Sequence, residues 1–361
     1  MTATVAKSPE FFDGLVLGVE TSCDETSAAV VRNGLDLLSV VVSSQIDEHA
    51  RFGGVVPEIA SRAHLENLQP VIRGALGQAG IEMRDVDAVA VTNGPGLAGA
   101  LLVGIAGAKA LALAIDVPMV AVNHLEGHLF ASLLSGQEVE LPAIALLVSG
   151  GHTMLVVIRD WGDYLVVGST LDDAAGEAFD KVGRYLDLGF PGGPAMEKAA
   201  CDGNPAAYDL PRAMLRDGYD FSFSGLKTAV VNAVEAQNSS GDALSVPDMA
   251  ASFQEAVIEV LAVKAIKAAV DFGSTNVLVG GGVAANGRLR SRLTEAGEEA
   301  GVRILVSPRE LCTDNAAMIA SAGAFRLAKS GASPLSTGAA PSLRAPFVLA
   351  QESRAARGSR E

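Results

Sequence analysis

The chain has 361 residues, of which 49% are hydrophobic and only 5% aromatic, and its 39 glycines far outnumber its 15 prolines. This length exceeds what one core usually supports, and the composition excludes a β-sandwich, a coiled coil and a disordered chain, so we expect a two-domain α/β protein with buried parallel strands. The net charge of −15 excludes nucleic-acid binding by bulk charge, so contact with RNA would need a local basic face or a partner.

The first half of the chain predicts a βαβ unit preceded by a strand pair. Apolar runs bounded by turn residues predict strands, and the Ala/Leu/Gly run after Asn93–Gly96 predicts a helix whose N-terminus follows a glycine-rich loop. The expected elements, in chain order, are strands at 15–20 and 27–31, a strand at 87–92, a helix at 97–115 and a strand at 117–122.

The second half repeats this plan, which predicts a duplicated fold with a cleft between two lobes. Its expected elements are strands at 144–148 and 154–159, a strand at 276–279, the loop Gly280–Gly282 and a helix at about 284–300. The predicted division is an N-terminal extension at 1–14, an N-terminal lobe at 15–140, a C-terminal lobe at 141–313 with a helical insertion at about 172–270, a C-terminal helix at 314–330 packing back on the N-terminal lobe, and a disordered tail at 331–361.

Several features predict a cytoplasmic protein. No apolar run of about 18 residues lacks a charge or a turn, so no membrane span is predicted. The N-terminal residues 1–14 contain no apolar segment of signal-peptide length. The chain has an odd number of cysteines, namely Cys23, Cys201 and Cys312, and no two of them form a C-x-x-C pair. This favours a reducing compartment without disulfides.

Two of the five histidines, His124 and His128, lie four residues apart. On a helix such positions are roughly 40° apart, so both imidazoles share a face and can bind one metal ion, although two satisfied structural histidines give the same pattern. Asp314 is the candidate third ligand, with a simple helix N-cap as its alternative role. Glu126 lies roughly 200° around the helix from His124, which excludes the zinc-protease arrangement, in which a glutamate follows the first histidine.

Three loops resemble ligand-binding turns. Thr21–Thr26 places acidic and hydroxyl side chains between two strands. The glycines of Ser149–Gly151 let the backbone approach a ligand closely. Gly280–Gly282 precedes a predicted helix, where Asn286 could bind a ribose or a base. A plain hairpin or a tight turn without a ligand is the alternative interpretation of each, although the position of Ser149–Gly151 in the repeat favours a ligand there. In the insertion, Phe221–Thr228 with Arg212 and Arg216 nearby is the predicted RNA-facing surface.

The motifs, in their order, resemble the TsaD family of tRNA N6-adenosine threonylcarbamoyltransferases. The matching stretches span about Leu17 to Lys329 and read LGVETSCDET, GGVVPEIASRAH, NGPGLAGAL, NHLEGH, LLVSGGHT, DDAAGEAFDKVGR, PGGP, FSFSGLKT, GGGVAANGRLR and CTDNAAMIA. The resemblance implies a duplicated actin-like ATPase fold of the actin, sugar-kinase and Hsp70 superfamily. Many relatives have a serine shortly before the position of Asn286, and the C-terminal tail has no counterpart.

The resemblance also implies an activity and its residues. The expected reaction is transfer of a threonylcarbamoyl group from threonylcarbamoyl-adenylate to N6 of the adenosine adjacent to the anticodon, in tRNAs reading codons that begin with A, with release of AMP. The implied partners are a paralogous protein of the same fold and a small P-loop ATPase. The implied residues are His124, His128 and Asp314 as ligands of a divalent metal of the iron type, Asp24 and Glu25 as catalytic acids, and Leu147, Val148, Ser149, Gly150, Gly151, Asp180, Gly193 and Asn286 as substrate contacts.

Three other functions remain as alternatives. An actin-fold sugar or acid kinase would share the phosphate loops but would not need the paired histidines. A metalloprotease is disfavoured by the position of Glu126, and a non-enzymatic scaffold by the acids and metal ligands. A covalent intermediate on Cys23 is unneeded, because AMP is a good leaving group and catalysis is then mostly orientation and charge stabilisation.

Overall fold

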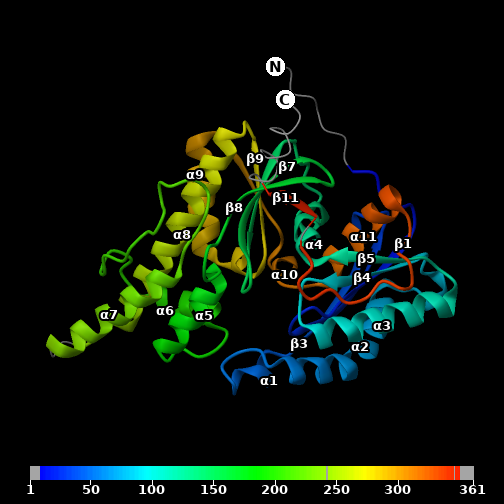
Figure 1. Cartoon of the computed structure of the whole chain (residues 1–361), viewed down its shortest axis with the longest axis horizontal. Coiled ribbons are helices and arrows are strands. Elements are labelled where there is room, and N and C mark those ends of the chain that lie inside the picture. The colour runs from blue at the N-terminus through cyan, green and yellow to red at the C-terminus, as the bar shows by residue number, and fades with distance from the viewer. Residues whose placement is uncertain (1–8, 241–242, 345, 350–361) are drawn as a thin grey trace, which may run out of the picture. The chain divides into compact units, whose positions relative to one another are not determined.

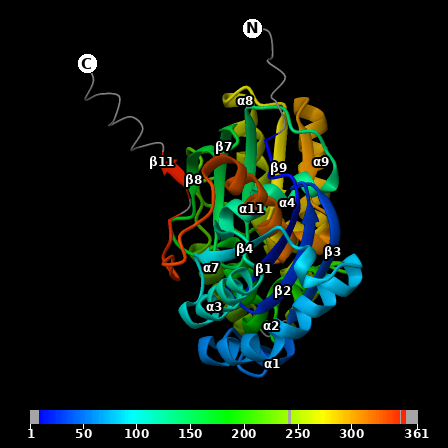
Figure 2. The same cartoon turned by 90° about the vertical axis from the view of Figure 1, so that its right-hand side faces the viewer.

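The computed structural model describes residues 9–240, 243–344 and 346–349 (Figures 1 and 2). The chain forms two compact units. The N-terminal unit contains the described residues of Lys7–Glu138 and Ser307–Pro346, and the C-terminal unit contains those of Val139–Val306 and 347–349. The chain therefore leaves the first unit near residue 138 and returns to it at residue 307.

The N-terminal unit is built on a five-stranded sheet of order β3-β2-β1-β4-β5. The strand β1 pairs antiparallel with β2 and parallel with β4, while β3 extends the antiparallel side and β5 the parallel side. The strands are β1 (Leu15–Glu20), β2 (Glu25–Arg32), β3 (Asp36–Ser44), β4 (Ala88–Gly94) and β5 (Met119–Asn123). The expected strands of this half are present, and β3, which the sequence analysis did not predict, adds an edge.

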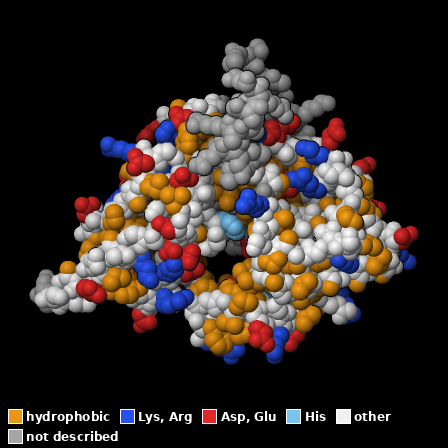
Figure 3. Space-filling model, viewed as in Figure 1, with side chains coloured by type: hydrophobic (Ala, Val, Ile, Leu, Met, Phe, Trp, Pro, Cys, Tyr) orange, Lys and Arg blue, Asp and Glu red, His pale blue; other side chains and the backbone are white. Residues whose placement is uncertain are grey.

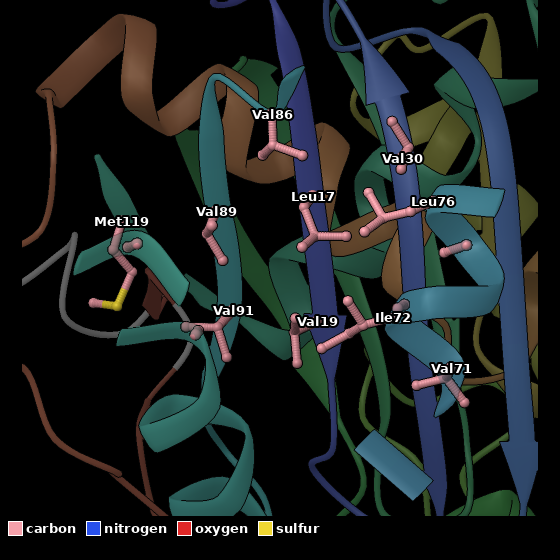
Figure 4. Close-up of a cluster of buried hydrophobic side chains, with 14 of the residues drawn as sticks. Leu17, Val19, Val30, Val71, Ile72, Leu76, Val86, Val89, Val91 and Met119 are labelled. Atoms are coloured by element: carbon pink, nitrogen blue, oxygen red, sulfur yellow. The ribbon is translucent and has the colours of Figure 1, made fainter. Parts of the chain in front are cut away.

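Side chains of β1 alternate between two helical layers, as the two-residue repeat of a strand requires. Leu17 and Val19 enter a core with Val89 and Val91 of β4 and Ile72 of α2 (Figure 4). Gly18 lies on the opposite face, where α11 packs so closely that an added Cβ would lie 2.2 Å from the Ala316 carbonyl oxygen. The helices of the unit are α1 (Ile46–Ala50), α2 (Pro57–Ala79), α3 (Ala98–Ile115), α4 (His124–Ala131), α10 (Arg309–Cys312) and α11 (Ala316–Ser330).

The helix α3 is by length and composition apolar enough to cross a membrane, with a mean hydropathy of 2.0. In the structure it packs against α2 and β4, with Leu101, Ile105 and Ala108 fully or almost fully buried. That packing is the one expected of a core helix in an α/β domain.

The C-terminal unit repeats the strand plan of the first. Its sheet has the order β10-β9-β6-β7-β8-β11, in which β6 is antiparallel to β7 and parallel to β9, as β1 is to β2 and β4. The strands are β6 (Ala143–Val148), β7 (Thr153–Asp160), β8 (Asp163–Ser169), β9 (Asn276–Gly280), β10 (Arg303–Val306) and β11 (Phe347–Leu349). The repeat predicted from the two glycine loops is thus present strand by strand.

Among the described residues of the C-terminal unit, four α-helices lie between β8 and β9, and a fifth lies between β9 and β10. They are α5 (Ala175–Tyr185), α6 (Gly192–Ala200), α7 (Ser224–Ser240), α8 (Val246–Asp271) and α9 (Gly287–Ala300). The helix predicted to begin near residue 284 begins at Gly287. Residues Gly282–Ala285 form a separate 3-10 turn, because Asn286 caps the helix with its side chain.

The prediction of a disordered tail from residue 331 is wrong for the described residues of that stretch. Ser333 donates its backbone N–H to the Met119 carbonyl, and its hydroxyl accepts from the Ala121 N–H. Ala340 N–H bonds to the Asn93 carbonyl, and β11 pairs parallel with β8. This order rests on hydrogen bonds to the strands β4, β5 and β8, which leave no apolar period in the sequence.

Candidate metal centre

The two histidines lie at the start of α4, directly after β5. Asn123 ends the strand and caps the helix, with its Oδ1 accepting hydrogen bonds from Leu125 N–H (3.0 Å) and Glu126 N–H (3.3 Å). This cap fixes the first turn, so His124 and His128 project from one face with ring centroids 4.8 Å apart. The helical spacing predicted from the sequence is therefore realised.

Asp314 reaches the same point from far along the chain. Its Oδ1 lies 3.3 Å from Nε2 of His124 and 3.3 Å from Nε2 of His128. The ligand atoms of these three residues all lie within 4.8 Å of one another. The alternative role of Asp314 as a helix cap is wrong, because α11 begins at Ala316 and Asn315 caps it through Met318 N–H at 3.1 Å.

The burial of His128 favours a bound group between these three side chains. Its side chain is 2% exposed, and within the described part of the chain neither ring nitrogen has a hydrogen-bond partner. Such buried polar atoms are costly unless they are bonded or coordinated. Two imidazole nitrogens and one carboxylate form a donor set that suits a divalent transition metal, so the residues fit such an ion.

A second carboxylate lies behind His124. Glu20 is fully buried and accepts hydrogen bonds from Ser22 N–H (2.6 Å), the Thr92 hydroxyl (2.7 Å) and His124 Nδ1 (3.0 Å). A proton on Nδ1 directed at Glu20 leaves the Nε2 lone pair facing Asp314, as in carboxylate–histidine–metal arrangements. Glu20 was not among the residues singled out from the sequence.

The charges around the cluster favour a cation. Burial lowers the pKa of His124, but Asp314 and Glu20 outweigh it and raise the pKa well above its ordinary value. Burial raises the pKa of the Asp314 carboxyl, yet His124 and His128 together hold that pKa below its ordinary value. A bound cation would supply the positive charge that these carboxylates otherwise draw from a proton.

Glu126 faces away from the ligands, as its helical position predicts. It is 1% exposed and forms a two-point ion pair with Arg326 of α11, with Nε–Oε2 at 2.8 Å and an Nη2–Oε1 separation of 2.7 Å. The pair joins the helix that carries two ligands to the helix that follows the third. Glu126 therefore has a structural partner and does not face the point where a metal-bound water would react.

The acid turn, defined as Ser22–Glu25, ends β1 beside this cluster. Ser22 Oγ lies 3.2 Å from His124 Nδ1. Burial raises the pKa of Glu25, with the charge of Asp24 adding to the effect, so the Glu25 carboxyl can hold a proton near neutral pH. Burial, followed by Asp24, also raises the pKa of Cys23, which leaves its thiol protonated and disfavours it as a nucleophile.

The predicted substrate residues lie in the C-terminal unit, where β6 ends in the Ser149–Gly151 turn. Gly281, with φ +93°, approaches so closely that an added Cβ would lie 2.4 Å from the Val148 carbonyl oxygen. Gly176 of α5 also lies against this turn and donates its N–H to the Ser149 carbonyl at 3.2 Å. The glycine loop, the turn and α5 are thus brought together, and their small residues leave backbone atoms accessible.

Asp180 and Asn286 are placed near these loops, but their polar atoms already have partners. Asp180 accepts the Gly192 N–H at 2.7 Å, which holds the start of α6 and with it Gly193. Asn286 accepts Leu289 N–H at 3.0 Å and donates to Gln254 at 2.9 Å. Substrate contact through Asn286 would therefore compete with its capping role.

The predicted RNA-facing loop is wrong in its aromatic part. Phe221 and Phe223 are buried core residues, so neither ring can stack on a base. Asp172 binds the loop through both Ser222 and Ser224 hydroxyls, and Arg212 pairs with Glu259. On the face drawn in Figure 3, Lys and Arg side chains lie in small groups among Asp and Glu rather than in one basic region.

The sequence matches one protein family and its curated members. The family model described as tRNA N6-adenosine threonylcarbamoyltransferase (TsaD) matches residues 36–321. Among curated relatives of that name, the Desulfitobacterium hafniense protein is 52% identical over 329 residues, covering 91% of this chain and 96% of its own. The Moorella thermoacetica protein is 53% identical over 329 residues, with the same two coverages.

Solved structures show the fold. The HypF structure from T. kodakarensis superposes with a TM-score of 0.61 at 16% identity, covering 91% of this chain and 50% of that one. Component A of the Acidaminococcus fermentans (R)-2-hydroxyglutaryl-CoA dehydratase gives a TM-score of 0.53 at 15% identity, covering 88% and 100%. With the strand repeat described above, these similarities identify the predicted duplicated actin-like α/β fold.

Proposed function

Because this chain belongs to the TsaD family of tRNA N6-adenosine threonylcarbamoyltransferases, a family of tRNA-modifying transferases, we propose that its donor is threonylcarbamoyl-adenylate. The acceptor is the N6 amine of the adenosine adjacent to the anticodon, in tRNAs that read codons beginning with A, and AMP is the leaving group. One divalent metal ion, Fe²⁺ by family resemblance, is held by His124, His128 and Asp314.

The observation that carries this proposal is the convergence of three ligand atoms on a point where the buried His128 has no hydrogen-bond partner among the described residues. A bound ion of this kind supplies positive charge that can hold a carboxylate or polarise a carbonyl oxygen. The chain orients the ligands through Glu20, which fixes the tautomer of His124, and through the Glu126–Arg326 pair.

The acid turn accounts for the proton that the acceptor loses. When N6 of adenosine bonds to the threonylcarbamoyl carbon, the bond to the AMP oxygen breaks and one N6 proton must leave. Asp24 is the carboxylate proposed to accept it, and Glu25, whose pKa is raised by burial, is the carboxyl proposed to hold a proton beside it.

The C-terminal unit is proposed to bind the adenylate. The proposed contacts are the backbone groups of Leu147, Val148 and Ser149–Gly151. Val148 lies close to Gly281, and Ser149 and Gly150 lie close to Gly176, so little side-chain bulk surrounds that turn. Asp180 fixes Gly192 and so orients Gly193, while Asn286 caps the helix beyond the glycine loop. These residues position the donor, and no covalent intermediate with the chain is required.

We further propose that the protein works in the cytoplasm with a paralogous actin-fold protein and a small P-loop ATPase. The net charge of −15 and the mixed charges seen in Figure 3 support a need for partners in tRNA capture.

The test is reconstitution with threonylcarbamoyl-adenylate, unmodified tRNA and the partner proteins, scored as modified adenosine by mass spectrometry. Wild-type protein should form the modified nucleoside. Phosphorylation of a small molecule by the wild type without formation of the nucleoside would instead support the kinase alternative.

The metal assignment has its own test. Asp314→Asn should lower bound metal, measured by elemental analysis, together with activity, because it weakens one of three ligands while the Asn315 cap of α11 remains. Cys201→Ser, an exposed site in the C-terminal unit, is the control. Full metal retention in Asp314→Asn would contradict the role of Asp314 as a ligand.

A further inference from the structure

Three consecutive carbonyl oxygens of the acid turn each accept a hydrogen bond from a different part of the N-terminal unit. Two of the donors are backbone N–H groups, whereas the middle donor is a histidine side chain. The contacts are Leu97 N to Ser22 O at 2.8 Å, His64 Nε2 to Cys23 O at 3.0 Å and Gln45 N to Asp24 O at 3.0 Å. The middle bond can therefore be removed by a single side-chain substitution.

The bond to Cys23 fixes the tautomer of His64. A carbonyl oxygen only accepts, so Nε2 must carry the proton and donate it. Nδ1 is then an acceptor, and it lies 2.8 Å from the Thr26 hydroxyl and 3.3 Å from Gln45 Nε2, both of which can donate. Every polar atom of the ring is thus satisfied by the neutral Nε2–H form.

The hydrogen bonds keep the same donor-to-acceptor direction further from the turn. Gln45 Oε1 accepts a hydrogen bond from His49 Nε2 at 3.1 Å, and His49 Nδ1 accepts the Val56 N–H at 3.3 Å. The relay formed by His49, Gln45 and His64 therefore runs in one direction, from the Val56 amide to the Cys23 carbonyl. Each member has a fixed donor and a fixed acceptor role.

Burying the relay costs desolvation free energy, which indicates that its side chains have a specific role. His49 and His64 are fully buried and Gln45 is 1% exposed. Burial also lowers the pKa of His64, which keeps the ring neutral and Nδ1 available as an acceptor. Apolar side chains could fill this volume without the desolvation of two imidazoles and an amide, whereas they could not donate to the Cys23 carbonyl.

We propose that His64, held in its Nε2–H tautomer by Gln45 and His49, is a positioning residue that fixes the acid turn for the transfer reaction. The inference rests on the proposed function of Asp24 and Glu25 in that turn. It also assigns a purpose to the GGVVPEIASRAH stretch, which contains His64 and which neither the metal cluster nor the substrate loops use.

The kinetic test compares three variants in the reconstituted system. His64→Leu removes the donor, and kcat should fall roughly tenfold or more with little change in KM for tRNA and with full metal content. His64→Gln keeps an amide N–H that can reach the Cys23 carbonyl, so it should recover most of the lost rate. Ser321→Ala is the matched control. Ser321 lies far along the chain from the turn and likewise donates a buried side-chain hydrogen bond to a backbone carbonyl, that of Gly34 at 2.6 Å.

A wild-type kcat in His64→Leu, or an equal loss in Ser321→Ala, would overturn the proposal. A wild type that forms no product at all would instead contradict the proposed function. The hydrogen-bond directions of the relay can also be measured on the wild-type protein, without an active enzyme and without a folded His64→Leu variant. In ¹⁵N-histidine-labelled wild-type protein at about pH 7, long-range ¹H–¹⁵N spectra should show His49 and His64 as neutral Nε2–H tautomers, and an Nδ1–H form at either would refute the relay.

Discussion

The ion pair between Glu126 and Arg326 makes a quantitative prediction about how the metal centre is held. The substitution Arg326→Met keeps most of the aliphatic length of the side chain but removes the guanidinium. It leaves the Glu126 carboxylate, which is 1% exposed, without its two-point partner across α4 and α11. The expected result is a loss of stability in the N-terminal unit and a looser arrangement of the ligands on α4.

The magnitude follows from burial. Removing one partner of a buried, hydrogen-bonded ion pair typically costs 3–5 kcal/mol, because the remaining charge is uncompensated. Arg326 has a side-chain exposure of 24%, so solvent screens part of the interaction and we expect the lower end, about 3 kcal/mol. This corresponds to roughly a hundredfold change in the folded-to-unfolded ratio of that unit.

The assay is hydrogen exchange of peptides covering α4 and α11, combined with urea unfolding and with bound-metal analysis. The double variant Glu126→Leu/Arg326→Met removes both charges and should regain much of the stability lost in Arg326→Met, because no buried carboxylate that has lost its guanidinium partner remains. If Arg326→Met exchanges like the wild type and keeps its metal, the pair is screened and does not hold the two helices together.

Three further predictions concern the same unit. Asn315→Ala should lower the free energy of unfolding in urea by about 1 kcal/mol, because the α11 cap is lost, and should lower bound metal because Asp314 is displaced. Unchanged metal content would show that the cap does not position the Asp314 ligand. Because the pKa of His64 is lowered in the native state, the imidazole is protonated at a higher pH in the unfolded chain than in the folded one. The stability of the fold should therefore decrease as the pH drops below about 6.5, and this dependence of stability on pH should be weaker in His64→Gln. Gly18→Ala should abolish soluble expression or strongly lower the melting temperature, since its Cβ would lie 2.2 Å from the Ala316 carbonyl oxygen.

Local patterns predicted the elements that are periodic along the chain. The apolar run of 15–20, the glycine loop before α3 and the four-residue spacing of His124 and His128 each depend on neighbours in sequence, and each has the expected local structure. The position of Glu126 on the far side of α4 followed from the same helical geometry.

Contacts between distant segments were not accessible in this way. Asp314 was expected at a helix start, but α11 begins two residues later, because the neighbouring Asn315 provides the cap and frees the Asp314 carboxylate for the histidines. Phe221 and Phe223 resembled a stacking surface, yet tertiary packing buries both rings. The order of residues 331–344 depends on hydrogen bonds to β4 and β5, which lie more than two hundred residues earlier in the chain.

The sequence by itself thus determined the duplicated α/β plan, the family and the pair of histidines, because helical and strand periods and ordered motifs are local properties. The tertiary structure alone decided what surrounds that pair. Glu20 behind His124, Asp314 between the two Nε2 atoms and the Glu126–Arg326 clamp come together because β1, α4 and α11 pack around one sheet. Burial then turns a common spacing into a cluster in which His128 has no hydrogen-bond partner among the described residues and the nearby carboxylates favour a cation.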